Sequence, residues 1–182
     1  MQVVGVVIAG GKSTRMGQDK ALLEVAGLTQ LERCKQLLRE AGCQQIYVSR
    51  NSADGIVDRL PERGPLGGLS SVLHTLELAS ERLLIVPIDM PLLTADALYH
   101  LLAQPQPAYF NGSPLPCVVT YSAELMNYLT EQLANPSGDW SIRGMLQAVA
   151  AQPVEWPYSY QLQNTNTPQQ WRHAIEMLGV SI

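Results

Sequence analysis

The sequence of 182 residues has little of what marks several large classes of protein. Its three cysteines, Cys34, Cys43 and Cys117, are too few and too scattered for a disulfide framework or a zinc site, so we expect free buried thiols in a reducing compartment. Charged residues make up only 15% and the formal net charge is −4, which argues against a nucleic-acid-binding protein. No apolar run is long enough for a membrane span or a signal sequence. The sequence therefore predicts a cytoplasmic protein that binds neither nucleic acid nor membrane.

Internal repeats, low-complexity segments and linkers are also missing. Hydrophobic residues make up 46% of the chain, so disorder is not expected. A chain of this length suits one domain with a full core, and we predict a single domain over residues 1–182.

What the sequence does contain is a short apolar run that leads into a loop rich in glycine and cations. Residues 3–8 are mostly β-branched and predict a buried strand. Residues 9–20 follow with three glycines, two lysines and an arginine. Glycine N–H groups approach a bound oxygen closely and clustered cations attract polyphosphate, so this loop predicts a phosphate site. The alternative is a glycine-rich turn whose cations are simply solvated.

The loop matches neither of the two common phosphate motifs. It contains no Gly-x-x-x-x-Gly-Lys-Ser/Thr string, and its glycines at positions 10, 11 and 17 do not give Gly-x-Gly-x-x-Gly. The string from Ala9 to Gly17, followed by Asp19 and Lys20, instead resembles the signature of sugar-nucleotide-type nucleotidyltransferases. Within that group it is most similar to the molybdenum cofactor guanylyltransferases.

Hydrophobic periodicity and capping signals predict alternating strands and helices along the rest of the chain. A helix at 29–41 and a strand at 46–48 complete a βαβ unit, which implies parallel strands, and a polar loop follows at 53–63. Further helices are expected at 64–80, 94–103, 122–133, 139–149 and 167–178, and further strands at 83–86, 108–110 and 117–121. Residues 154–162 predict an irregular aromatic segment with one edge strand.

Two stretches near the middle of the chain carry candidate site residues. Residues 64–68 place three glycines at a helix start, which costs helix stability unless a ligand or another element approaches closely; a tightly packed turn without ligand is the alternative. Asp89 follows a buried strand and lies between Pro87 and Pro91, at the sheet edge where parallel strands bind ligands. A carboxylate there suits Mg²⁺. The alternative is an aspartate that caps a helix or braces the loop.

Other polar or aromatic residues have a structural explanation beside a functional one. His74 is a lone histidine that we expect to be structural, and Trp140 is expected to serve as core or lid in preference to a base-stacking platform. Near the end of the chain, a capping box explains Thr167 to Gln170. It does not explain Asn164 and Asn166, whose alternating side chains are placed to face one site.

The family resemblance covers most of the chain. Its anchors are residues 8–20, 64–68, 87–91 and 164–168, in family order. It implies an α/β fold with a three-layer, Rossmann-like, mostly parallel sheet flanked by helices, of the nucleotide-diphospho-sugar transferase type. It also implies transfer of GMP from GTP to the terminal phosphate of molybdopterin with Mg²⁺, releasing pyrophosphate. GTP and molybdopterin would be the substrates, and other proteins of molybdenum cofactor biosynthesis would be transient partners.

The resemblance carries roles to particular positions. Lys20 and Arg15 would stabilise the triphosphate and Asp89 would bind Mg²⁺, and these three are the expected catalytic residues. Asn164 and Asn166 would lie near the metal or the acceptor phosphate. The implied nucleotide contacts are Ile8, Ala9, Gly10, Gly11, Lys20, Ser49, Asn51, Asp58, Pro65, Leu66 and Asp89. In-line attack by an acceptor phosphate needs no protein nucleophile, so charge neutralisation and positioning by such residues suffice.

Two departures from the family pattern lie on the nucleoside side. Ser49 stands where the family usually has asparagine, with Asn51 two residues later, and the loop from there to Gly64 is short. Residues 9–11 and 64–68 nevertheless favour guanine over cytosine. The competing hypotheses are a nucleotidyltransferase that uses CTP with molybdopterin, one that uses a sugar or polyol phosphate, and a non-catalytic nucleotide-binding protein.

Overall fold

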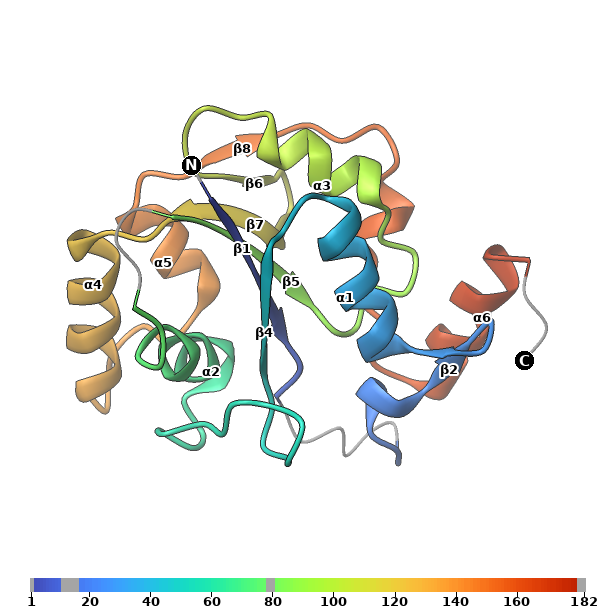
Figure 1. Cartoon of the computed structure of the whole chain (residues 1–182), viewed down its shortest axis with the longest axis horizontal. Coiled ribbons are helices and arrows are strands. Elements are labelled where there is room, and N and C mark those ends of the chain that lie inside the picture. Colours follow the sequence, from blue (N-terminus) through green and yellow to red (C-terminus); the bar gives the residue numbers. More distant parts are fainter. Residues whose placement is uncertain (1, 11–16, 78–80, 180–182) are drawn as a thin grey trace.

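A six-stranded sheet forms the centre of the protein, in a computed structural model that describes residues 2–10, 17–77 and 81–179. The strands lie in the order β4-β1-β5-β7-β6-β8 (Figure 1). Their bounds are β1 Val3–Ile8, β4 Gln45–Ser49, β5 Arg82–Pro87, β6 Ala108–Phe110, β7 Ser113–Thr120 and β8 Gln152–Val154.

Both parallel and antiparallel pairs build this sheet. β1 runs parallel to β4 and to β5, which confirms the predicted βαβ unit, and β6 runs parallel to β8. Only β7 runs against its neighbours, β5 and β6. The carboxyl ends of β1, β4 and β5 therefore meet at one edge, which is where a mostly parallel α/β sheet places its ligands.

Helices cover both faces of the sheet, so the fold has three layers. α1 and α3 pack on one face, and α2, α4 and α5 pack on the other (Figure 1). Helix α6 belongs to neither layer and packs in a separate small cluster. The bounds are α1 Gln30–Glu40, α2 Gly64–Leu73, α3 Ala95–Leu102, α4 Ala123–Ala134, α5 Ile142–Ala148 and α6 Pro168–Met177.

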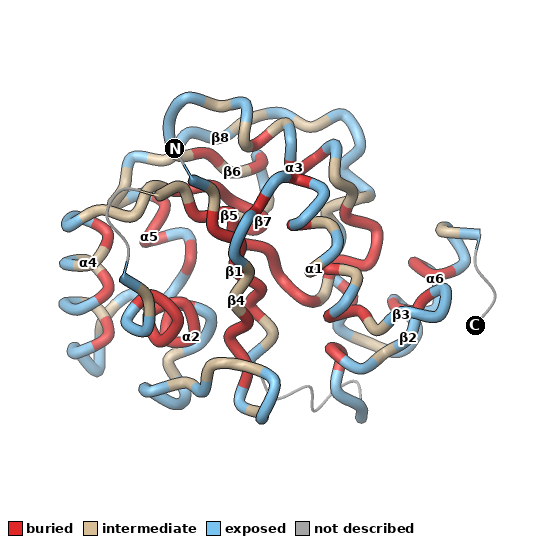
Figure 2. Tube along the Cα trace, viewed as in Figure 1, coloured by how far each residue is buried: buried red, intermediate tan, exposed pale blue. Residues whose placement is uncertain are grey.

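The alternation of side chains along β1 explains how one strand serves both layers. Val4, Val6 and Ile8 pack in the core beneath α2, α4 and α5, whereas Val7 packs in the core beneath α1 and α3. This is the period of two expected for a strand that is buried on both sides. Figure 2 shows the buried residues concentrated in the central strands and on the helix sides that face them.

A small hairpin and α6 form a separate cluster at one side of the molecule. β2 Glu24–Val25 pairs with β3 Leu28–Thr29, and Val25 packs against Trp171 and Ile175 of α6. The hairpin was not predicted, because two-residue strands carry too little periodicity to be recognised. The capping box at Thr167 and Gln170 is present as expected.

Two predicted helices are shorter than expected, because local side-chain bonds end or delay them. α2 stops at Leu73 instead of Ser80, where the Thr75 hydroxyl and amide both donate to the Val72 carbonyl. α5 begins at Ile142 instead of Asp139, since Asp139 accepts from the Ser141 amide and Ser141 becomes the N-cap.

None of the helices in the described ranges has the length and apolar character needed to cross a membrane. The three cysteines are free and buried, as predicted.

Candidate functional site

The loops that follow β1, β4 and β5 are held together at the carboxyl edge of the sheet. The Ala9 amide donates to the Ser49 carbonyl at 2.9 Å, which joins the loops after β1 and β4. The Ile88 amide donates to the Ile8 carbonyl at 3.1 Å, which joins the loops after β5 and β1. Three segments that are distant in sequence therefore share one edge, as the parallel topology requires.

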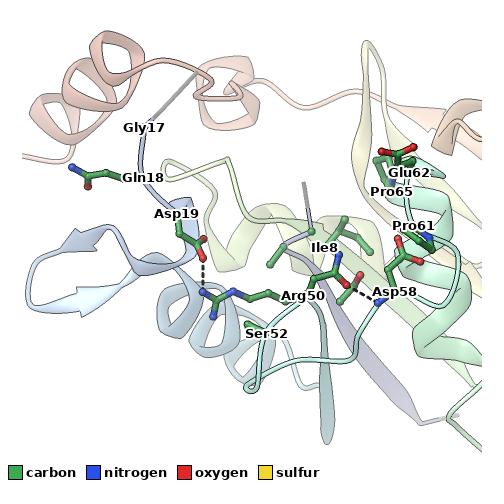
Figure 3. Close-up of a pocket in the computed structure, with 16 residues that line it drawn as sticks. Ile8, Gly17, Gln18, Asp19, Arg50, Ser52, Asp58, Pro61, Glu62 and Pro65 are labelled. Carbon is green, nitrogen blue, oxygen red and sulfur yellow. Dashed lines mark hydrogen bonds and ion pairs between the residues drawn. The ribbon is translucent and has the colours of Figure 1, made fainter. Parts of the chain in front are cut away.

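A cleft of about 1180 Å³ opens at this edge, between the β1 loop, the β4 loop and the start of α2 (Figure 3). Seven of the predicted nucleotide-contacting residues line it, namely Ile8, Ala9, Gly10, Ser49, Asn51, Asp58 and Pro65. Leu66 does not line it, because its side chain is fully buried in the core beneath α2. Gly11 and Arg15 lie outside the described residues. A volume in this range suits a small-molecule ligand.

Lys20 is the centre of a second group of predicted site residues. Its Nζ donates to Asn166 Oδ1 at 2.8 Å and lies 3.8 Å from Asp89 Oδ2. Only 11% of the Lys20 side chain and 20% of the Asp89 side chain are exposed. The structure thus brings together three residues that were predicted from widely separated parts of the sequence.

Backbone contacts fix the segment that carries Asn166. The Thr165 amide and hydroxyl both donate to the Asp89 carbonyl, at 2.8 and 3.1 Å. The Asn166 amide donates to Gln170 Oε1, within the cap of α6. Asn164 is exposed on the same segment. The Asp89 loop and residues 164–166 are therefore one structural unit.

The Asp89 carboxylate is largely buried and lies beside the Lys20 ammonium. Burial raises its pKa, although the Lys20 ammonium partly opposes that shift. Its Oδ1 is buried and has no hydrogen-bond partner within the described ranges. The described residues contain no group of three or more His, Cys, Asp or Glu side chains that would enclose a metal. Mg²⁺ fits this donor set, since it is commonly held by one or two carboxylates together with substrate phosphates.

Packing between α2 and β4 explains one glycine of the 64–68 stretch. A Cβ added to Gly68 would lie 2.2 Å from Ser49 Oγ, far inside any normal contact. The close approach predicted from the sequence is therefore made by another element of the protein, and Gly68 also lines the cleft. Gly10 is less crowded. A Cβ added there would lie 3.8 and 3.9 Å from the nearest described atoms, which belong to Ser49.

Two of the cleft residues also brace the short loop after β4. The Asp58 amide donates to Asn51 Oδ1 at 2.7 Å, and Asp58 Oδ1 accepts from the Leu60 amide and the Ser71 hydroxyl. The side chains of Asn51 and Asp58 are thus engaged within the protein in addition to lining the cleft.

Arg50 is a cleft residue that the sequence analysis did not single out. Its side chain is 8% exposed, and its guanidinium forms ion pairs with Asp19 and Asp54, the first at 2.5 Å (Figure 3). Hydrogen bonds and charge from these two carboxylates raise the Arg50 pKa against the effect of burial. Its position directly after a predicted strand was the one sequence signal that could have identified Arg50 as a site residue. Its partner Asp19 lies 31 residues away, so no local pattern indicated the pair.

His74 and Trp140 have protein partners, as their structural explanations predict. His74 Nδ1 lies 2.8 Å from the Ser70 carbonyl oxygen. The Trp140 indole N–H donates to the Gln132 carbonyl, and the Arg63 guanidinium lies 3.8 Å from the ring centroid. Neither residue lines the cleft within the described ranges.

Comparison with known proteins places this geometry among nucleotidyltransferases. The family described as MobA-like NTP transferase domain matches residues 5–154. A molybdenum cofactor guanylyltransferase of Xanthomonas euvesicatoria pv. vesicatoria is 41% identical over 177 residues, covering 94% of this chain and 93% of the relative. The family match covers the site segments at 8–10, 49–58, 64–68 and 89, whereas residues 164–166 lie beyond it.

Solved structures show the same fold at low sequence identity. The molybdopterin-guanine dinucleotide biosynthesis protein A of Archaeoglobus fulgidus superposes with a TM-score of 0.70 at 18% identity, covering 97% of this chain and 98% of that one. A CMP:2-keto-3-deoxy-manno-octonic acid synthetase complexed with CTP gives a TM-score of 0.67 at 14% identity, with 98% and 99% coverage. The expected three-layer fold, with its mostly parallel sheet, is thereby confirmed.

Proposed function

The chain belongs to the MobA-like NTP transferase family, and on this premise we propose that it transfers GMP from GTP to the terminal phosphate of molybdopterin. The products are the guanine dinucleotide form of the cofactor and pyrophosphate. The observation that carries the proposal is the contact of Lys20 with Asp89 and Asn166. Asp89 follows β5, whose carboxyl end lies at the sheet edge where the cleft opens, although none of these three residues lines the cleft within the described ranges. The name of the relative with 41% identity supports the choice of substrates.

The reaction places its demands on charge and alignment. An oxygen of the acceptor phosphate attacks the α-phosphorus of GTP, a new P–O bond forms, and the bond to the bridging oxygen breaks as pyrophosphate leaves. The acceptor is already an anion, so no strong general base is required. The site must instead hold two anions together and align them for in-line displacement.

The residues of the site meet these demands in distinct ways. The Lys20 ammonium is held by Asn166 and Asp89, so that it offers a fixed positive charge to the phosphates. Asp89 would hold Mg²⁺ through its carboxylate, whose buried Oδ1 has no hydrogen-bond partner among the described residues. Bound there, Mg²⁺ would supply charge neutralisation and orientation of the phosphate oxygens. Gly10, at the start of the glycine-rich loop, would let backbone N–H groups approach the nucleotide.

The test compares nucleotides and acceptors. The protein is incubated with Mg²⁺, each of the four NTPs in turn and either molybdopterin or a sugar or polyol phosphate, and released pyrophosphate is measured. We expect release with GTP that depends on molybdopterin. Release with CTP in place of GTP would identify a cytidylyltransferase, and release only with a sugar or polyol phosphate acceptor would identify a different nucleotidyltransferase. Absence of release with every combination would favour a non-catalytic nucleotide-binding protein.

A further inference from the structure

We propose that Arg50 is a positioning residue for Lys20, acting through Asp19. This inference rests on the proposed function for its catalytic consequence. Its structural part concerns the chain alone. Arg50 comes directly after β4, Asp19 precedes Lys20, and the two side chains point toward each other at the rim of the cleft (Figure 3).

The first step of the argument is that Arg50 is itself rigidly held. Its amide donates to the Ile56 carbonyl at 3.0 Å, and its carbonyl accepts from the Ser52 amide at 2.9 Å. The loop wraps it so tightly that a Cβ on Gly55 would lie 2.7 Å from the Arg50 Cβ. Its side chain is 8% exposed, which is low for an arginine. Arg50 is therefore a fixed point on the β4 side of the cleft.

The second step is that Asp19 links this fixed point to Lys20. Arg50 Nη2 donates to Asp19 Oδ2 at 2.5 Å. The other oxygen of the same carboxylate, Oδ1, accepts from the Ala21 amide at 3.0 Å and so caps the 3-10 turn Lys20–Leu22. One carboxylate thus joins the guanidinium to the backbone turn on which Lys20 stands.

The third step is that Lys20 depends on this turn for its place. Lys20 is its first residue, and its side chain extends from there to Asn166 and Asp89. A turn of three residues has few internal hydrogen bonds of its own, so its N-terminal cap contributes much of its order. Release of Asp19 from Arg50 would free the cap and, with it, the base of the Lys20 side chain.

Asp54 offers a matched comparison within the same ion-pair group. It also pairs with Arg50, yet its carboxylate accepts from the Ser52 hydroxyl, within the same β4 loop. Asp19 and Asp54 are similarly exposed, at 46% and 50% of the side chain. The proposal predicts that loss of the Arg50–Asp19 pair affects Lys20 and that loss of the Arg50–Asp54 pair does not.

The test measures the reactivity of Lys20 without any substrate. The folded protein is treated with an amine-acylating reagent, and acylation of Lys20 relative to Lys35 is quantified by peptide mass spectrometry. We expect Arg50→Gln and Asp19→Asn each to raise Lys20 acylation severalfold, while Asp54→Asn and the surface control Arg143→Gln leave it at the wild-type level. Unchanged acylation in folded Arg50→Gln would overturn the proposal. If Arg50→Gln does not fold, equal acylation in Asp19→Asn and Asp54→Asn would overturn it.

Turnover provides the second arm. If transfer of GMP is observed in the wild type, Arg50→Gln should reduce kcat/KM for GTP by roughly tenfold to a hundredfold, as expected for a displaced catalytic group. The double variant Arg50→Gln/Asp19→Asn should be no worse than the more impaired single variant, because both changes break one link. If the losses of kcat/KM in the two single variants multiplied in the double variant, Arg50 would contact the nucleotide independently of Asp19. Lack of wild-type turnover would overturn the proposed function and leave the acylation arm to decide the role of Arg50.

Discussion

Asn166 accepts a hydrogen bond from the Lys20 ammonium at 2.8 Å, across 146 residues of sequence. The bond joins the start of the chain to the segment before α6, next to the loop that carries Asp89. Because Asn166 is neutral, it orients the ammonium without cancelling its charge. Asp89, 3.8 Å from the same ammonium, offsets part of that charge, and the bond to Asn166 holds the ammonium in a fixed position for an anionic ligand.

Lys20→Ala should therefore remove a fixed positive charge from the phosphates. We expect kcat/KM for GTP to fall by about a hundredfold to a thousandfold, the range found when one preorganised donor is lost. Asn166→Ala should have a smaller effect in the same direction, because the lysine remains. Lys35→Ala is the matched control, since Lys35 pairs with Glu32 on α1. Equal losses in Lys20→Ala and Lys35→Ala would show that only overall charge matters.

Asp89→Asn should abolish most activity while preserving the fold. The variant keeps an oxygen at this position but loses the charge that would hold Mg²⁺, so turnover should fall by at least about a hundredfold. The raised pKa of Asp89 shows that its charged form is disfavoured by burial, so removing the charge should not lower Tm. Near-normal Mg²⁺-dependent turnover in this variant would exclude Asp89 as the metal ligand. Turnover and thermal melting are measured on the same preparation.

Gly68→Ala should destabilise the protein through its contact with Ser49. The added methyl group would lie 2.2 Å from Ser49 Oγ, and overpacking of this kind costs about 1–3 kcal/mol of unfolding free energy. The double variant Ser49→Ala/Gly68→Ala should recover part of that loss, because the hydroxyl is gone. Denaturant unfolding of the three variants checks this. A double variant as unstable as the sum of the singles would locate the strain elsewhere.

Gly10→Ala should change base selection without changing stability. Among the described residues, the nearest atoms to the added methyl group would lie at 3.8 and 3.9 Å, which is ordinary contact distance. We expect the wild type to prefer GTP over CTP and the variant to lose part of that preference, because the methyl group takes up space beside a purine. The ratio of kcat/KM values for GTP and CTP is the measurement. A ratio that is the same in both proteins would show that this loop does not choose the base.

Ser52→Ala should weaken the β4 loop in a pH-dependent way. The Ser52 hydroxyl is the main cause of the lowered pKa of Asp54, with the Arg50 guanidinium contributing. A carboxyl whose pKa is lowered in the folded state stabilises that state above its ordinary pKa of 3.8, and this contribution is lost as the pH falls through the lowered value. Tm of the variant should therefore lie slightly below wild type at neutral pH and converge with it well below pH 3.8. A difference in Tm that stays constant over this pH range would show that the Ser52–Asp54 hydrogen bond is not its cause.

Local signals were enough to predict much of the fold. The β-branched run at 3–8, the cap at Thr29 and the strand at 46–48 specify a βαβ unit, and the structure confirms its parallel pairing. α6 begins at Pro168 as predicted, because its capping box is complete within the four residues from Thr167 to Gln170. The ends of α2 and α5 were wrong, since single hydroxyl and carboxylate bonds decided them.

In the candidate site, local sequence signals were sufficient for some residues and insufficient for others. Asp89 could be placed at the ligand edge because its position follows directly from the strand before it. The contact between Lys20 and Asn166 was not predicted, because it depends on the whole topology. The family resemblance suggested only that Asn166 lies near the metal or the acceptor phosphate. Arg50 was missed because its meaning depends on Asp19, a partner that no local pattern connects to it. Long-range polar pairs have no periodicity, so one sequence gives little warning of them.

The most direct test of the central claim follows the α-phosphorus of GTP. The protein is incubated with Mg²⁺, molybdopterin and GTP that carries its radiolabel on the α-phosphorus, and the labelled products are separated. The account predicts that the label appears in a molybdopterin guanine dinucleotide and that this product is absent with Asp89→Asn. Label found in free GMP or retained in GTP, with no labelled dinucleotide, would contradict it.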